Sequence, residues 1–235
     1  MLVKICGVTS RQAATQCAQA GADFLGLNFH PPSVRFISDA LAAEIVNALP
    51  GSCLPVGVFV DRPVEHVRAT AKTVGLHWVQ LHGNEPISDI LELQASGLAV
   101  IRAYRIGTVE DLQQMAADLC QMSYLGANPQ AVLVDAKGQP GQPGGTGRTI
   151  PAELIAQLPR FPTGSDDDPA SPEATLPPSR LILAGGLNPT NVAAQIQNAG
   201  RSNLWMVDTA SGVEQAPGLK DPVKVEAFLK AARGA

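Results

Sequence analysis

Short apolar segments and amphipathic segments alternate eight times along this chain of 235 residues. The apolar segments are mostly unbroken by polar residues, as in parallel strands that are buried on both faces. They occupy residues 3–6, 24–29, 54–60, 78–83, 100–104, 131–136, 180–186 and 204–210. The amphipathic segments have apolar residues at helical spacing, and the first lies between a capping Ser10 and a terminating Gly21. We expect helices near residues 11–20, 38–49, 63–74, 86–95, 109–122, 151–158, 188–200 and 221–232.

This alternation predicts an α/β fold in which eight parallel strands are covered by helices. An open sheet is the alternative, but eight βα units favour closure into a (β/α)₈ barrel, the TIM barrel. A chain of 235 residues has the usual size of such a barrel. We therefore expect residues 1–235 to form a single domain.

Residues 159–179 interrupt the pattern. They are rich in Pro, Ser and acidic residues and have no periodic apolar face, which is typical of disorder. A linker between two domains would have a similar composition, but only two βα units follow it. We expect a disordered, acidic and Pro-rich insertion between the sixth helix and the seventh strand, on the barrel face opposite the active site.

The net charge of −4 gives no general attraction for nucleic acid or for an anionic membrane. No segment approaches the roughly 20 apolar residues that cross a bilayer. Lys4 and Arg11 interrupt the first apolar run, so we expect no signal peptide and a cytoplasmic protein. The four cysteines are scattered, without a CxxC pair or zinc-type spacing, so we expect reduced thiols and no structural metal.

Polar and reactive residues collect where the predicted strands end, which is where (β/α)₈ barrels carry their catalytic groups. In chain order they are Cys6, Asn28 with Arg35 beyond it, Asp61, His82, Arg102 or Arg105, Asp135, Gly185 with Gly186, and Asp208. Taken singly, each has a structural alternative. Cys6 could be a packed core thiol and Asp135 a capping carboxylate, while Arg35 could be a solvated loop residue and His82 a structural histidine.

Eight motifs in register resemble the phosphoribosylanthranilate isomerase family of tryptophan biosynthesis. They are KICG (4–7), S-x-R (33–35), VGVF (56–59), QLHG (80–83), LVD ending at Asp135, GGTG (144–147), LAGGLNPTNV (183–192), and SGVE followed by GLKD (211–221). The resemblance runs nearly end to end, apart from the 159–179 insertion.

The resemblance implies an isomerase that converts N-(5-phosphoribosyl)anthranilate to 1-(2-carboxyphenylamino)-1-deoxyribulose 5-phosphate by an acid/base Amadori rearrangement. It implies that Cys6 is the base that removes the C2 proton and that Asp135 is the acid that protonates the ring oxygen. It also implies that Arg35 binds the anthranilate carboxylate and that His82 lines the pocket. Such proton transfer needs no cofactor and no metal. A thiol acts as a base near neutrality only where its surroundings favour the thiolate.

The loops after the seventh and eighth strands are the expected phosphate site, because their backbone N–H groups can point inward. The residues expected there are Gly185, Gly186, Ala210 and Ser211. Asp208, at the end of the eighth strand, is a further expected substrate-binding residue. The family commonly has a serine at position 210, so a hydroxyl contact is lost and the backbone donor remains. We expect Gly145 and Gly147 of the GGTG motif in a mobile flap that closes over the substrate.

Other functions differ in the residues that they require. The related isomerase of the histidine pathway has an aspartate in place of Cys6, although a side activity on its substrate stays open. Indole-glycerol-phosphate synthase needs a lysine and glutamate pair that is not found at matching strand ends. A binding protein without activity would be expected to have lost Cys6 or Asp135. The expected partner is a phosphorylated small molecule, and the expected state is a monomer, with a dimer as the alternative.

Overall fold

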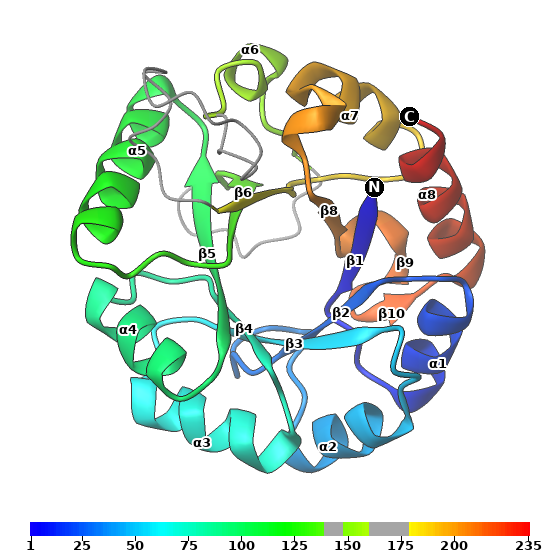
Figure 1. Ribbon diagram of the computed structural model, residues 1–235. Coiled ribbons are helices and arrows are strands. Elements are labelled where there is room, and N and C mark those ends of the chain that lie inside the picture. The colour runs from blue at the N-terminus through cyan, green and yellow to red at the C-terminus, as the bar shows by residue number, and fades with distance from the viewer. Residues whose placement is uncertain (139–147, 160–178) are drawn as a thin grey trace.

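The computed structural model describes residues 1–138, 148–159 and 179–235. Eight parallel strands close into a barrel in chain order, because β8 pairs back onto β1. Helices form a ring around this barrel (Figure 1). The predicted (β/α)₈ barrel is thereby confirmed.

The elements have the following bounds. The barrel strands are β1 (Leu2–Cys6), β2 (Phe24–Asn28), β3 (Leu54–Phe59), β4 (Trp78–Leu81), β5 (Ala99–Ile106), β6 (Ala131–Ala136), β7 (Arg180–Leu183) and β8 (Met206–Thr209). The helices are α1 (Arg11–Gln19), α2 (Asp39–Ala48), α3 (Val64–Val74), α4 (Ile87–Ala95), α5 (Val109–Tyr124), α6 (Ala152–Ile155), α7 (Val192–Ala199) and α8 (Pro222–Gly234). Short 3₁₀ helices η2 (Arg201–Asn203) and η3 (Ser211–Val213) flank β8, and an antiparallel pair, β9 (Glu214–Ala216) and β10 (Leu219–Lys220), follows.

Polar caps start the helices where the sequence predicts. The Ser10 hydroxyl accepts from the Ala13 N–H, and Asp221 caps α8. Two predicted helices were too long, and one pair of strands was missed. Helix α6 covers only Ala152–Ile155, and α7 begins at Val192 because the residues before it form a turn. The β9–β10 pair was not predicted, since its strands have only three and two residues.

Successive residues of each barrel strand point alternately inward and toward the helices. Val3 and Ile5 of β1 pack in the layer between barrel and helices. Lys4 is the register partner of Phe24, whose ring packs inside the barrel. The inside of the barrel therefore receives both Lys4 and Cys6.

An aromatic cluster fills the amino end of the barrel. The Phe24 ring centroid lies 5.7 Å from that of Trp78 and 5.5 Å from that of Trp205, and the two indoles stack 5.9 Å apart. The Arg180 guanidinium covers Trp205 at 4.9 Å. With this end packed, the carboxyl ends of the strands are left for a ligand site.

Residues 160–178 of the expected insertion, and the expected flap residues Gly145 and Gly147, lie outside the described residues. The described residues on either side of 160–178 contact the amino end of the barrel. The Pro159 carbonyl accepts from Asn203, just before β8, and the Ser179 hydroxyl donates to the carbonyl of Pro129, just before β6. Within the described ranges, no helix is long and apolar enough to cross a membrane.

Candidate active site

The two expected catalytic residues lie at carboxyl ends of barrel strands: Cys6 is the last residue of β1 and Asp135 the next-to-last residue of β6. Asp135 is the register partner of Arg105 and lies two residues after the inward-facing Leu133, so it points to the same side. Both side chains therefore enter the barrel mouth from strands that are not neighbours.

A buried ion pair lies beneath Cys6. The Lys4 ammonium is 0 % exposed and lies 3.0 Å from the Asp208 carboxylate of β8. Lys4 and Asp208 are register partners, and the Lys4 side chain lies on the same face of β1 as Cys6. Asp208, which we expected to bind substrate, thus forms an ion pair with Lys4 in this structure.

Burial raises the pKa of the Cys6 thiol above its ordinary value, and the Asp208 carboxylate raises it further. Lys4 and Lys220 oppose this rise but do not overcome it. In this structure the surroundings of Cys6 taken together favour the neutral thiol, while Lys4 and Lys220 favour the thiolate. The cations are present, but the loss of solvent around the sulfur outweighs them.

Arg35 is fixed by a carboxylate rather than left free in its loop. Its Nε and Nη2 donate to the two carboxylate oxygens of Glu214 at 2.8 and 2.7 Å. The left-handed Gly7 (φ +73°) lies under this arginine, and a Cβ there would overlap the Arg35 Cδ. Nη1 is the guanidinium nitrogen left without a partner in the described part of the chain.

Lys220 completes this second cluster. Its ammonium donates to Glu214 and to the Ala210 carbonyl, at 2.8 and 2.9 Å. Burial alone would raise the pKa of Glu214, but Arg35 and Lys220 together lower it below its ordinary value. Burial also lowers the pKa of Lys220 despite its carboxylate partner. Glu214 is consequently an ionised, buried bridge between two cations.

His82 contacts the proposed acid directly. Its Nε2 lies 3.4 Å from the Asp135 Oδ2, while the other oxygen of Asp135 accepts from the Ala136 N–H at 2.8 Å. The Gln80 amide lies 2.7 Å from the His82 Nδ1. With Gln80 donating there, a neutral His82 carries its proton on Nε2, facing Asp135. His82 therefore orients the carboxyl group as well as lining the mouth.

The loop after β7 has the expected turn. Gly185 and Gly186 both adopt left-handed φ angles, of +88° and +57°. Two asparagines fasten the loop: the Asn188 side chain accepts from the Thr190 N–H, and Asn191 donates to the Gly186 carbonyl at 3.0 Å.

The loop after β8 lies against the loop after β7, because the Thr209 hydroxyl donates to the Leu187 carbonyl at 2.6 Å. Gly186, Ala210 and Ser211 keep partly exposed surface. The structure thus brings the two expected phosphate loops together.

Other polar residues of the rim have structural partners. Arg102 alternates with inward-facing residues of β5, so it points to the helix layer, where it pairs with Glu85 at 2.9 Å. Arg105 donates to the His82 carbonyl at 2.8 Å. Asp61 accepts from the Asn84 N–H at 2.6 Å. These contacts shape the loops after β3, β4 and β5.

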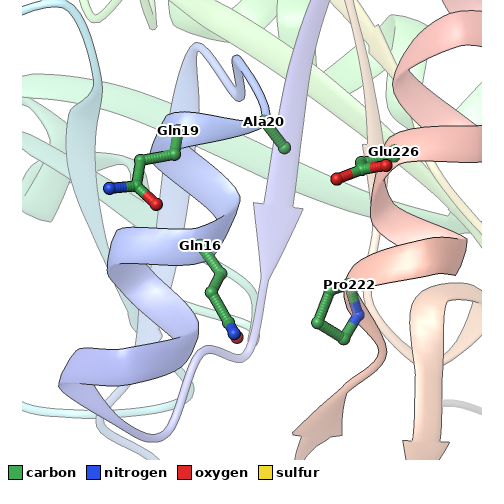
Figure 2. A pocket seen from close by; sticks show the side chains of 5 residues that line it. All are labelled: Gln16, Gln19, Ala20, Pro222 and Glu226. Carbon is green, nitrogen blue, oxygen red and sulfur yellow. The ribbon is translucent and has the colours of Figure 1, made fainter.

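A surface pocket between α1 and α8 is separate from the barrel mouth (Figure 2). Its lining consists of Gln16, Gln19, Ala20, Pro222 and Glu226. None of the expected site residues lines it.

Sequence reasoning missed the roles of Lys4, Glu214 and Lys220, although each stands in one of the quoted motifs. A charged residue inside an otherwise apolar strand, as in VKIC, was the available signal for Lys4. The partners of Glu214 could not be read from the sequence, because Arg35 lies 179 positions away.

Comparison with known proteins agrees with this geometry. Residues 3–231 match the family model described as N-(5'-phosphoribosyl)anthranilate (PRA) isomerase. The N-(5'-phosphoribosyl)anthranilate isomerase of Symbiobacterium thermophilum is 39 % identical over 100 % of this chain and 99 % of its own.

Two solved structures are similar over 100 % of both chains. One, with a TM-score of 0.77 and 31 % identity, is a phosphoribosyl anthranilate isomerase in complex with reduced 1-(o-carboxyphenylamino)-1-deoxyribulose 5-phosphate. The other, with a TM-score of 0.78 and 31 % identity, is described as monomers generated from the dimeric isomerase of Thermotoga maritima.

Proposed function

Because the chain belongs to the N-(5'-phosphoribosyl)anthranilate isomerase family, we propose that Cys6 and Asp135 carry out the family's reaction at this barrel mouth. The protein is an isomerase of tryptophan biosynthesis that converts N-(5'-phosphoribosyl)anthranilate to 1-(2-carboxyphenylamino)-1-deoxyribulose 5-phosphate. The residue roles that follow are our proposal.

Asp135 donates a proton to the ribose ring oxygen, so the bond between this oxygen and C1 breaks and an iminium forms between C1 and the anthranilate nitrogen. The Cys6 thiolate then removes the proton from C2, and the electrons of that C–H bond form a C1–C2 double bond as the iminium becomes an amine. The resulting enol tautomerises to the ketone by gaining a proton at C1 and losing one from the oxygen. The contact with the His82 Nε2, at 3.4 Å, orients Asp135 for the first step.

Two anchors place the substrate between these groups. The free Nη1 of Arg35 binds the anthranilate carboxylate, while Glu214 holds the other edge of the guanidinium. Backbone N–H groups around Gly186 and Ser211 bind the phosphate. Gly145 and Gly147 stay in the proposal as flap residues, although they lie outside the described part of the chain.

The observation that carries this proposal is the placement of Cys6 and Asp135 at strand ends of one barrel mouth, with His82 against the carboxylate. The test follows the loss of anthranilate-type fluorescence after freshly made phosphoribosylanthranilate is mixed with Cys6→Ser or Asp135→Asn. We expect each variant to lose about 10²- to 10⁴-fold in kcat, as is usual for removal of a general acid or base. The exposed Cys120→Ser serves as the matched control. Near-normal kcat at saturating substrate would refute the role of that residue.

We further propose that the enzyme is a cytoplasmic monomer, as its composition and resemblance suggest. A dimer like that described for the Thermotoga maritima relative is the alternative. Light scattering on the purified protein distinguishes a 24.5 kDa particle from one of twice that mass.

A further inference from the structure

The reaction steps proposed above assign no role to Lys4, yet it lies directly beneath the proposed base. Lys4 and Cys6 are two residues apart on β1, so both side chains point into the barrel. The Lys4 side chain has no exposed surface, and its ammonium acts to lower the pKa of the Cys6 thiol. A buried ammonium is costly unless it is paired, so its presence in the barrel needs an explanation.

Pairing with Asp208 keeps Lys4 charged. Burial alone would lower the pKa of Lys4, but the Asp208 carboxylate and the Cys6 thiol raise it above its ordinary value. A buried ion pair is often no more stabilising than well-packed apolar side chains of similar size. A gain in folding stability from the Lys4–Asp208 pair therefore does not explain why a cation lies beside the thiol.

Four charged groups face Cys6 from the elements packed around it. They are Lys4 on β1, Asp208 on β8, Lys220 on β10 and Arg35 after β2. Arg35 and Lys220 are both committed to Glu214. Of the cations, Lys4 lies on the same strand as Cys6 and lowers the pKa of its thiol more than Lys220 does.

We propose that Lys4 is a positioning residue for Cys6: its buried ammonium, held by Asp208, donates a hydrogen bond to the sulfur and stabilises the thiolate that removes the C2 proton. The inference rests on the proposed role of Cys6 as the base. When the thiolate takes up the proton its charge is lost, and Lys4 keeps Asp208 as its partner. The barrel thus offsets part of the desolvation of the sulfur without exposing it to water.

The test measures the pH dependence of Cys6 alkylation by iodoacetamide, with peptide mass spectrometry to identify the site. A Cys120→Ser background removes the exposed thiol. The buried Cys17 and Cys53 react slowly, because burial raises the pKa of Cys17 to about 11 and that of Cys53 to about 12. The variants are Lys4→Met and Lys4→Met/Asp208→Asn, the second of which leaves no unpaired carboxylate if the first fails to fold.

We expect alkylation at pH 7.5 to be about tenfold slower in Lys4→Met, which corresponds to a rise of about one pKa unit in the thiol. The double variant should be slowed less, because Asp208→Asn removes a carboxylate that raises the pKa of Cys6. The kcat/KM of Lys4→Met should fall by a similar factor at pH 7.5 and recover as the pH is raised. The exposed Lys230→Met on α8 should change neither quantity.

An unchanged alkylation midpoint in a folded variant, or a loss of kcat/KM that is equal at every pH, would overturn the proposal by making Lys4 purely structural. The proposed function fails separately, through turnover by Cys6→Ser, because alkylation reports on the thiol whether or not it is the base.

Discussion

At the scale of single residues, two cations share one carboxylate beside the proposed base. Arg35 and Lys220 both bind Glu214, so this cluster carries one positive charge in excess. The Lys4–Asp208 pair next to it is balanced. A substrate with a carboxylate and a phosphate can compensate the excess charge, whereas a neutral sugar cannot. The cluster therefore favours anionic ligands at the barrel mouth, although the chain as a whole has a net negative charge.

Glu214→Gln should destabilise the fold by about 3 kcal/mol, because it leaves the buried Lys220 and the partly buried Arg35 facing a neutral amide. The Glu214 and Lys220 side chains are only 4 % and 2 % exposed. The matched control is Glu44→Gln, whose side chain is 60 % exposed at 4.0 Å from Arg11 and should cost less than about 0.5 kcal/mol. Urea denaturation of both variants measures the difference, and equal midpoints would contradict the prediction.

The contribution of Glu214 to stability should decrease in acid. The pKa of Glu214 is lowered in the folded state by Arg35 and Lys220, after burial is offset. Its stabilisation is therefore complete above the ordinary glutamate pKa of about 4.3 and is lost as the pH falls through the lower folded-state value. The destabilisation of Glu214→Gln should accordingly shrink in acid.

At the scale of elements, the strands were the most predictable parts, because both of their faces are buried and their sequences are almost continuously apolar. The loops that carry the site were less predictable. The turn at Gly185 and Gly186 was expected from glycine, but the asparagine contacts that fasten it depend on the three-dimensional path of the chain. The β9–β10 pair holds Glu214 and Lys220 and was missed, since short strands carry little periodic signal.

The loop after β7 yields a prediction about binding. Asn191→Ala removes the hydrogen bonds to the Gly186 carbonyl and the Asn188 N–H, so the N–H groups proposed for the phosphate lose their fixed direction. We expect KM to rise about tenfold with kcat nearly unchanged, as for a contact made equally in ground and transition states. Inhibition by inorganic phosphate should weaken by a similar factor. Asn198→Ala, exposed on the same helix, is the control; a fall in kcat without a change in KM would argue against this role.

At the scale of the whole molecule, the barrel and the strand-end positions of Cys6 and Asp135 followed from alternation and motif order. The charge network did not, because its members lie far apart in sequence: Lys4 and Asp208 are separated by 204 positions. Local patterns specify periodicity and caps, whereas buried pairs form only when barrel closure brings β8 against β1. The net upward shift of the Cys6 pKa could likewise not be predicted, since it depends on burial by the closed barrel.

Barrel geometry also predicts the consequence of removing the acidic, Pro-rich segment. Pro159 and Ser179 contact residues just before β8 and β6, at the end of the barrel opposite Cys6 and Asp135. Deleting residues 163–176 should therefore leave kcat and KM unchanged in the fluorescence assay. A Gly-Ser replacement of the same length is the control, because it removes the side chains without shortening the connection between α6 and β7. Both variants should keep the far-ultraviolet circular dichroism spectrum of the parent. If they do and both still lose most of their kcat, the side chains of 163–176 support catalysis, either from the far end of the barrel or through a second subunit.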